Sequence, residues 1–557
     1  MIIQNGLRKE LVHKRYVLGA HPILQHFMDQ MKIPEIMSTY LPKDQRMTLS
    51  TEKTLAVVLH NILTHPMPLY EIGQWLQPLD ESRVGLGSKE SGLINDDRVA
   101  KAFDDFYSSR HQDIFFRLAL RSIKLFKIDC QQMHQDTTTV TFSGRYDNWR
   151  AQPALAHGAN KDHRPDLKQL VLGLSVSADG AVPLAHEIYD GNQTDDRLHP
   201  ANHKRLRQLL ERSDFIYVAD CKLATEDNLT KLSACGGLFI TVMPRTWKED
   251  GQFRQEARQK KIQWNHLLSR TNNRKPGSKR DHYYLAAGTY ATKQGYRLLW
   301  IKSSGKAEQD KQTRDRHVQR ACEELKAIQA RLNTYSLKKR KNIKKRIAAV
   351  LQEKQCLNFI DYHITQKSYA KRSYLKAGRP RAATPKKSVS KKYFTLSFAP
   401  NRQQLAQERL CDGVFPLLTN LMEHTPKKVL ETYKYQPFLE KRHSQLKTYQ
   451  EIAPVFLKKP ERVIAYLHMQ VMALMVATLI ERQLRLAMKH KVVDSLPIYP
   501  EGKHCPHPTV FDIVRLFNNV ERYEVQENDR AFIFPAQLNK AQKQVLELLE
   551  VPVALYQ

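Results

Sequence analysis

Two apolar, strand-like runs in this chain each end at an aspartate, and a third acid follows much later near the start of a helix. The runs LFKIDCQQMHQD and FIYVAD end at Asp136 and Asp220, and Glu440 lies in YKYQPFLEKRHSQLK. Two strand ends and a helix can bring three carboxylates together at one edge of a sheet. Four other acids lie near these residues in the sequence and compete for the same role: Asp129, Asp147, Glu226 and Asp227.

The order of the predicted elements around these acids indicates the kind of sheet. Strand-like runs rich in β-branched residues begin near residue 120, and two of them are joined by a predicted hairpin turn at Asp179-Gly180. A predicted helix over DDRLHPANHKRLRQLLERS then leads into the strand before Asp220. Three strands, a helix and a further strand, with acids at the ends of the first and fourth strands, is the order of the ribonuclease H-like fold. The predicted fold class is therefore α/β, with a ribonuclease H-like mixed sheet as its core.

A large insertion is expected inside this core. Glu440 follows Asp220 by 220 positions, which is too long for a connection within one compact domain. The insertion begins with strand-like runs and continues from 308 to 358 as a charged stretch with two apolar stripes, which predicts a projecting helical hairpin. Residues 364–394 hold ten Lys or Arg and no acid. Interleaved tyrosines, glycine and prolines favour a phosphate-gripping loop there over a solvated linker.

Five segments are predicted along the chain. The first is an α-helical N-terminal domain that is expected to serve DNA binding or assembly, and the remaining boundaries follow the insertion: 1–112 for the helical domain, 113–245 and 411–490 for the two parts of the ribonuclease H-like core, 246–410 for the insertion and 491–557 for a C-terminal tail domain. The apolar run 463–480 is long enough to span a bilayer. It contains His468 and Gln470 and has charged flanks, so a buried helix is predicted and no membrane partner.

The charge of the chain indicates a polyanionic partner. The formal net charge is +32, from 89 Lys and Arg against 57 Asp and Glu. Such a protein gathers nucleic acid by neutralising phosphates and releasing counterions. A cluster of acids in it would repel that partner unless divalent metal ions lay between acids and phosphate. Seven scattered cysteines without a CxxC pair argue against a disulfide framework and a cysteine-rich zinc site, and indicate a reducing interior.

The region around Glu440 carries a spaced set of residues. Tyr433, Gln436, Glu440 and Lys447 are separated by gaps of two, three and six residues. With the D-T-T-T segment at Asp136 and the later V-A-D, this set resembles bacterial insertion-sequence transposases with a DDE triad, whose third acid lies in a tyrosine, arginine, glutamate, lysine signature. Gln436 stands where that family usually has arginine.

The resemblance implies a site and its partners. Asp136, Asp220 and Glu440 would be the catalytic acids and would hold two Mg²⁺ ions, with Mn²⁺ as a substitute. The expected partner is double-stranded DNA, both the terminal inverted repeats of an element and the target, held by a homodimer in a bacterial, nucleoid-associated setting in the cytoplasm. Arg442 would supply the charge that Gln436 lacks. The expected DNA contacts are Tyr433, Gln436, Arg442 and Lys447, together with Lys371, Arg372, Arg379, Arg381, Lys386 and Lys387 of the basic loop.

Other interpretations of the same residues stay open. A non-catalytic DNA-binding protein derived from such an enzyme, or a metal-dependent nuclease without strand transfer, would share this sequence pattern. His134 and His443 could support the acids or contact DNA, or serve only as structural residues. The three tryptophans of the insertion could stack on an unpaired base, although packing in a core is favoured for each.

Overall fold

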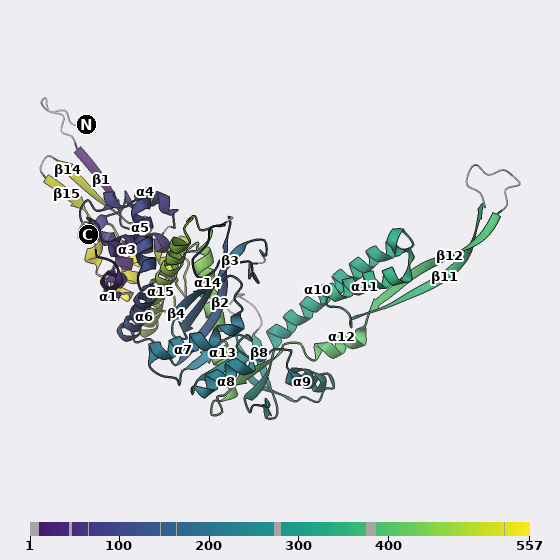
Figure 1. Cartoon of the computed structure of the whole chain (residues 1–557). Helices are drawn as coiled ribbons and strands as arrows, with labels where there is room; N and C mark the ends of the chain where they lie inside the picture. Colours follow the sequence, from purple (N-terminus) through teal and green to yellow (C-terminus); the bar gives the residue numbers. More distant parts are fainter. Residues whose placement is uncertain are drawn as a thin grey trace. The chain divides into compact units, whose positions relative to one another are not determined.

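The computed structural model describes most of the chain and divides it into two compact units, shown in Figure 1. The first unit combines Met1–Thr241 with Leu430–Gln557, and the second is Val242–Val429. Within these ranges the described residues are 11–43, 47–64, 66–144, 146–162, 164–271, 280–374, 386–527 and 530–557.

The first unit contains a mixed sheet. Its strands lie in the order β4-β3-β2-β5-β6, with bounds Gln132–Phe142 for β2, Lys168–Ser177 for β3, Pro183–Tyr189 for β4, Ile216–Val218 for β5 and Leu238–Val242 for β6. β3 runs antiparallel to both β2 and β4, whereas β5 runs parallel to β2 and β6. The expected hairpin turn is present between β3 and β4, where Gly180 has a φ of +83°. This mixed α/β arrangement is compatible with the predicted ribonuclease H-like fold.

Helices precede, separate and follow the strands of this sheet along the chain. α1 to α6 precede β2, α7 (His199–Leu210) leads into β5 and α8 (Glu226–Ala234) leads into β6. The remaining bounds are His21–Met31, Ile33–Tyr40, Thr51–Thr64, Ile72–Leu76, Asp96–Ser108 and His111–Phe126 for α1 to α6, then Pro426–Tyr433, Gln436–Thr448, Pro460–His490, Val510–Phe517 and Lys540–Leu548 for α13 to α17.

The N-terminal region is not entirely helical. β1 (Leu11–Val17) pairs antiparallel with β14 (Glu521–Glu527), which also pairs with β15 (Arg530–Phe534). Strands from the two ends of the chain, which the sequence analysis assigns to separate domains, thus share one small sheet. A single strand such as β1 needs a partner for its backbone groups, and the C-terminal strands provide it.

Helix α15 is the apolar helix predicted from 463–480. It is long and apolar enough to cross a membrane, yet 94% of its most apolar window is buried within the protein. Its first turns pack on the N-terminal helices, because Arg462 pairs with Asp104 at 2.7 Å and the rings of Phe103 and Tyr466 lie 6.2 Å apart. The N-terminal helices therefore share a core with α15 instead of forming one of their own.

The second unit has its own strands. They lie in the order β13-β10-β8-β7, with β9 beside β10 and with bounds Trp264–Arg270, Asp281–Ala286, Tyr290–Ala291, Arg297–Ser303 and Val414–Thr419 for β7, β8, β9, β10 and β13. On this sheet Trp300 is buried and stacks on Phe253 of α9 (Lys248–Arg258), with ring centroids 3.9 Å apart. Trp300 is therefore a core residue, and it does not stack on a base.

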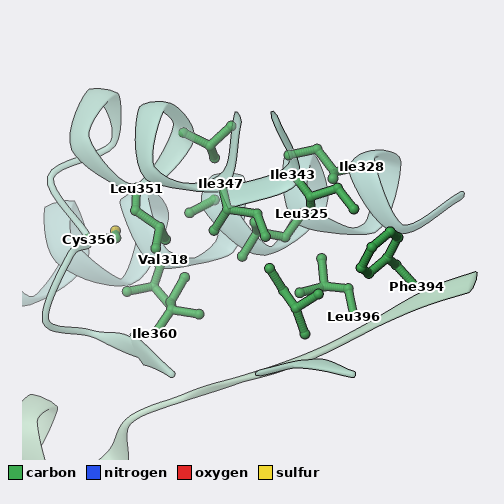
Figure 2. Packing of buried hydrophobic residues seen from close by; sticks show 13 residues of the cluster. Val318, Leu325, Ile328, Ile343, Ile347, Leu351, Cys356, Ile360, Phe394 and Leu396 are labelled. Carbon is green, nitrogen blue, oxygen red and sulfur yellow. The ribbon is translucent and has the colours of Figure 1, made fainter. Parts of the chain in front are cut away.

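The rest of the second unit is a helical hairpin with a strand pair (Figure 1). α10 (Ser304–Ala330) and α11 (Arg340–Glu353) form the predicted helical hairpin, and β11 (Ile360–Tyr374) pairs with β12 (Lys386–Pro400), followed by α12 (Arg402–Arg409). Residues 364–394, predicted as a loop, thus belong mainly to an antiparallel ribbon. Figure 2 shows the reason: Ile360, Phe394 and Leu396 point at the apolar side chains of α10 and α11. Burial of alternate residues fixes two strands where the charge and the interleaved tyrosines, glycine and prolines indicated a loop.

Candidate active site

The pairing of two parallel strands brings Asp136 and Asp220 together. In the register of β2 and β5, His134 lies opposite Val218. Asp136 and Asp220 each come two residues after this pair, so they lie at the same level, with Asp220 just beyond the end of β5. Backbone amides hold both side chains, since the N–H of Thr137 donates to Asp136 Oδ1 at 2.8 Å and that of Lys222 donates to Asp220 Oδ1 at 2.9 Å.

The two carboxyl groups hold their protons more tightly than usual. Burial raises the pKa of Asp136 above its ordinary value, and Lys161 only partly offsets that effect. Burial likewise raises the pKa of Asp220, and the charges of Asp136 and Asp195 raise it further. The charge of each acid therefore affects the pKa of its neighbour, because both are largely shielded from solvent. Such a group of carboxylates is stabilised by any cation that binds among them.

Two residues of this cluster were missed by the sequence analysis. Asp195 begins a short 3₁₀ turn after β4 and accepts a hydrogen bond from Thr137 Oγ1 at 2.8 Å. The Nζ atom of Lys161 lies 3.4 Å from Asp136 Oδ1 and 3.7 Å from Asp195 Oδ2, and donates to the carbonyl of Thr137 at 2.6 Å. The acid pair in NQTDDR was a signal for Asp195, since it follows a strand end. Nothing in the sequence around Lys161 singled it out.

Helix α14 is fixed against β2 by buried polar contacts. Gln436 donates from Nε2 to the carbonyl of Gln135 at 3.0 Å, and its Oε1 lies 2.8 Å from Nδ1 of His134. Two turns further along, Nδ1 of His443 lies 3.7 Å from Asp136 Oδ2. Burial lowers the pKa of His443 to about 3, with Lys161 adding to the effect, so this imidazole is neutral beside the acid. Both histidines left open by the sequence are thus buried, and His443 touches the acidic cluster.

Glu440 lies on the same stripe of α14 as these contacts. Gln436, Glu440, His443 and Lys447 follow at intervals of four, three and four residues, which places them along one side of a helix. Glu440 itself is exposed, and Lys447 donates to Asp162 Oδ1 at 2.7 Å. The third predicted acid therefore faces solvent beside the helix side that contacts β2.

Tyr433 senses all three predicted acids. Burial raises the pKa of its hydroxyl, and the charges of Asp220, Glu440 and Asp136 contribute to the same shift. Tyr433 and Glu440 therefore lie near enough to the pair of aspartates for the charges to act on one hydroxyl. That the three acids form one site stays a prediction.

A preassembled metal site is not present in the part of the chain that the structure describes. Within it, no group of three or more His, Cys, Asp or Glu side chains is close enough to hold a metal ion. The donor chemistry nevertheless fits Mg²⁺ or Mn²⁺, because all three acids offer carboxylate oxygens. The ammonium of Lys161 already lies between the carboxylates of Asp136 and Asp195. These residues could therefore hold divalent ions once side chains adjust.

Comparisons with known proteins add two findings. Residues 14–120 match a family model described as a domain of unknown function (DUF4277), and no curated protein matches the chain. Among solved structures, the chain is similar to a cryo-EM structure of the piggyBac transposase synaptic complex with hairpin DNA. The identity is 12% and the TM-score 0.26, over 53% of this chain and 63% of that one. The likeness is weak and spans less than two thirds of the piggyBac chain.

Two predicted DNA contacts on α14 are corrected by the structure. Gln436 is buried, and both ends of its amide are used by β2. Arg442 is also buried: it pairs with Glu481 of α15 at 2.6 Å and donates to the carbonyl of Ala181 at 3.1 Å. Its position three residues before Gln445 and two after Glu440 turns it toward α15, away from the exposed side of α14. Arg442 thus anchors the helix and cannot replace the missing arginine of the signature.

The basic residues predicted on the loop lie on or beyond the ribbon. Lys371 is in β11, and Lys386 and Lys387 are in β12. Arg372 is exposed and lies opposite Ser388. Two further predicted contacts are outside the described residues: Arg379 and Arg381.

Proposed function

We propose that this chain is a DDE-type transposase that cleaves DNA at the ends of an insertion sequence and joins the freed 3′ ends to a target. One observation carries the proposal. Asp136 and Asp220 lie at the same level on neighbouring parallel chain segments, because each follows the paired residues His134 and Val218 by two positions. The spacing of Tyr433, Glu440 and Lys447 supports it, since α14 is fixed on the same strand.

Each residue of the site has a proposed role. Asp136, Asp220 and Glu440 would hold Mg²⁺, or Mn²⁺ in its place, and the bound ions would activate water or a 3′-hydroxyl and stabilise the leaving oxygen. Lys161 neutralises Asp136 and Asp195 while no DNA is bound. Tyr433 would donate its hydroxyl to a phosphate oxygen, because its raised pKa keeps it protonated.

The proposed partners follow from the charge of the chain and from the proposed reaction. The net charge of +32 favours binding of DNA through its phosphates, for both the terminal inverted repeats and the target. A homodimer is proposed because two element ends must be held together during joining. The proposed setting is the bacterial cytoplasm, at the nucleoid.

One observation favours a second function. The described residues contain no preassembled group of metal-binding side chains. A non-catalytic DNA-binding protein derived from a transposase would also lack such a group. A nuclease without strand transfer would need the same acids but no target contact.

A strand-transfer assay distinguishes the three functions. Purified full-length protein is incubated with Mg²⁺, a plasmid and labelled duplexes that carry the terminal repeats of its own element. We expect labelled ends covalently joined to the plasmid. Cleaved ends without joining would indicate a nuclease, and binding without cleavage would indicate a DNA-binding protein; either result would reject the transposase proposal.

A further inference from the structure

The tip of the helical hairpin in the second unit carries cations and no acids. Between residues 338 and 345 the chain has six cations, defined here as the helix-tip patch: Lys338, Lys339, Arg340, Lys341, Lys344 and Lys345. All six side chains are exposed. None of them forms a salt bridge with any residue that the structure describes. Next to the patch, Tyr335 is 92% exposed and borders a hollow of 640 Å³ that Lys345 also lines.

The packing of α11 forces like charges together on its exposed side, which destabilises the helix when no anionic partner is bound. Ile343 and Ile347 are buried against α10, so Lys341 and Lys345 lie on the opposite side of the helix and Lys344 lies on its exposed flank. Lys341 and Lys345 are four residues apart, a spacing at which like charges destabilise a helix. A face that served only for solubility would mix both signs of charge. A face of one sign that repels itself indicates an anionic partner that relieves the repulsion.

Hydrogen bonds fix the patch in position relative to the β11–β12 ribbon. Asn333, three residues after the end of α10, has a left-handed φ of 64° and forms two hydrogen bonds with the backbone of Phe394 in β12. Its Nδ2 donates to the carbonyl of Phe394 at 2.9 Å, and its Oδ1 accepts from the Phe394 N–H at 2.8 Å. Gln329 donates to the carbonyl of Leu396 at 2.9 Å. Together with the shared apolar core in Figure 2, these contacts make the helix tip and the base of the ribbon one rigid surface.

The ribbon continues the cationic surface and adds tyrosines. Lys367 lies opposite Tyr393, and Tyr369 lies opposite Lys391, so these four side chains share one face. It is the face turned away from Phe394, because neighbours along a strand point to opposite sides. Tyr369 and Tyr393 are 49% and 45% exposed, and both lysines are exposed. The ribbon thus carries alternating cationic and aromatic groups. Its strands β11 and β12 extend past the ends of α10 and α11 (Figure 1).

We propose that the helix-tip patch and the ribbon form one binding surface for double-stranded DNA, with the ribbon in the major groove and the patch on the adjacent phosphates. The major groove of B-form DNA admits a two-stranded β-ribbon, whereas the deep, narrow groove of duplex RNA does not. The lysines on both parts neutralise phosphates. The inference rests on the proposed function for its partner, and it does not depend on the chemistry of the acids.

The test compares two triple variants of the full-length protein that lose equal charge. Lys341→Gln, Lys344→Gln and Lys345→Gln together remove half of the helix-tip patch. Lys503→Gln, Lys540→Gln and Lys543→Gln remove three exposed lysines of the first unit as the matched control. Fluorescence anisotropy measures the affinity for a DNA duplex of arbitrary sequence, and for an RNA duplex of the same sequence, over a range of KCl concentrations.

The expected result is specific to the patch. The slope of log K against log salt should become shallower by about 2.7 in the helix-tip variant, roughly 0.9 for each lost contact, and stay unchanged in the control. The corresponding triple Lys→Arg variant should keep the wild-type slope. An unchanged slope in the helix-tip variant, or RNA duplex bound as tightly as DNA, would overturn the inference. Asp136→Asn, measured in parallel, should bind normally; its failure to lose cleavage would reject the proposed function alone.

Discussion

The Nζ atom of Lys161 lies 3.4 Å from Oδ1 of Asp136, so the first predicted catalytic acid already has a cation beside it. The same ammonium lies 3.7 Å from Asp195, which gives one lysine two carboxylate neighbours. Without that charge, burial and mutual repulsion would oppose the ionised acids even more strongly. Lys161 therefore stabilises the carboxylates without a metal, and under the proposed function it would compete with a divalent ion for the same oxygens.

Replacing Lys161 should change the response of the protein to Mg²⁺. In Lys161→Gln we expect a lower melting temperature without metal and a larger rise on adding Mg²⁺ than in wild type. Metal at a hundred times its Kd stabilises the folded state by about 2.7 kcal/mol, so the difference is measurable by differential scanning fluorimetry. Lys168→Gln, near Asp147 at the 4.0 Å limit of an ion pair, serves as the control. Equal Mg²⁺ responses in all three proteins would show that Lys161 does not occupy a metal position.

The three acids should be needed for chemistry and not for DNA binding. Asp136→Asn, Asp220→Asn and Glu440→Gln each remove a charged ligand and little volume. We expect each to slow end cleavage on the order of a thousandfold, while the Kd for DNA changes little. The rate is measured by single-turnover cleavage of a labelled end. Asp147→Asn, whose side chain is 72% exposed, is the matched control. A variant that keeps more than roughly a tenth of the wild-type rate would remove that residue from the triad.

Buried histidines should make the fold sensitive to acid. Nε2 of His186 lies 2.6 Å from Nδ1 of His468, and burial lowers the pKa of His186 to about 3, with Arg205 and His111 adding to the effect. The unfolded chain binds this proton near pH 6.5, and the folded chain does not. The free energy of unfolding therefore falls as the pH drops from about 6.5 towards 3, by about 1.4 kcal/mol per pH unit for each such histidine.

Equilibrium denaturation in urea between pH 7 and 5 measures this slope. His186→Gln should reduce this slope by the contribution of one histidine, about 1.4 kcal/mol per pH unit at most, because glutamine binds no proton. His363→Gln, on the exposed part of β11, should leave the slope unchanged. The explanation would be contradicted by equal slopes in His186→Gln and wild type.

The sequence predicted a strand at each of the first two acids, but β2 continues beyond Asp136 to Phe142, so this acid lies within its strand and not at the strand's end. The parallel register that brings Asp136 level with Asp220 follows from the order of strands. The catalytic role of both acids stays a prediction. Asp195 and Lys161 were not predicted, because their places depend on loops that close over β2 from elsewhere in the chain. Short loops carry no periodic pattern that fixes where a side chain points.

Two errors arose from reading charge without packing. Arg442 was predicted to meet DNA because it could supply the charge that Gln436 lacks, yet its place two residues after Glu440 turns it into the core between α14 and α15. Residues 364–394 were predicted as a loop because tyrosines, glycine and prolines are interleaved with many cations. Ile364, Phe394 and Leu396 instead bury one side of a ribbon against α10 and α11. A few apolar residues at alternate positions outweigh many exposed lysines, since only the buried ones determine which backbone pairs.

Arg442 should contribute to stability and not to DNA affinity. Its guanidinium bonds Glu481, which is fully buried, and the carbonyls of Gly180 and Ala181, so it links α14, α15 and the β3–β4 turn. Arg442→Ala leaves the buried carboxylate of Glu481 with only the longer ion pair to Arg485, at 3.5 Å, and should lower the free energy of unfolding by about 3 kcal/mol. The double variant Arg442→Met with Glu481→Met removes the close ion pair, but it leaves Arg485 without a carboxylate, so it should recover only part of that loss. Urea denaturation gives the stabilities, and anisotropy at a temperature where all variants are folded gives the affinities. A folded Arg442→Ala protein that binds DNA tenfold more weakly, with wild-type stability, would restore Arg442 as a DNA contact and contradict the buried arrangement.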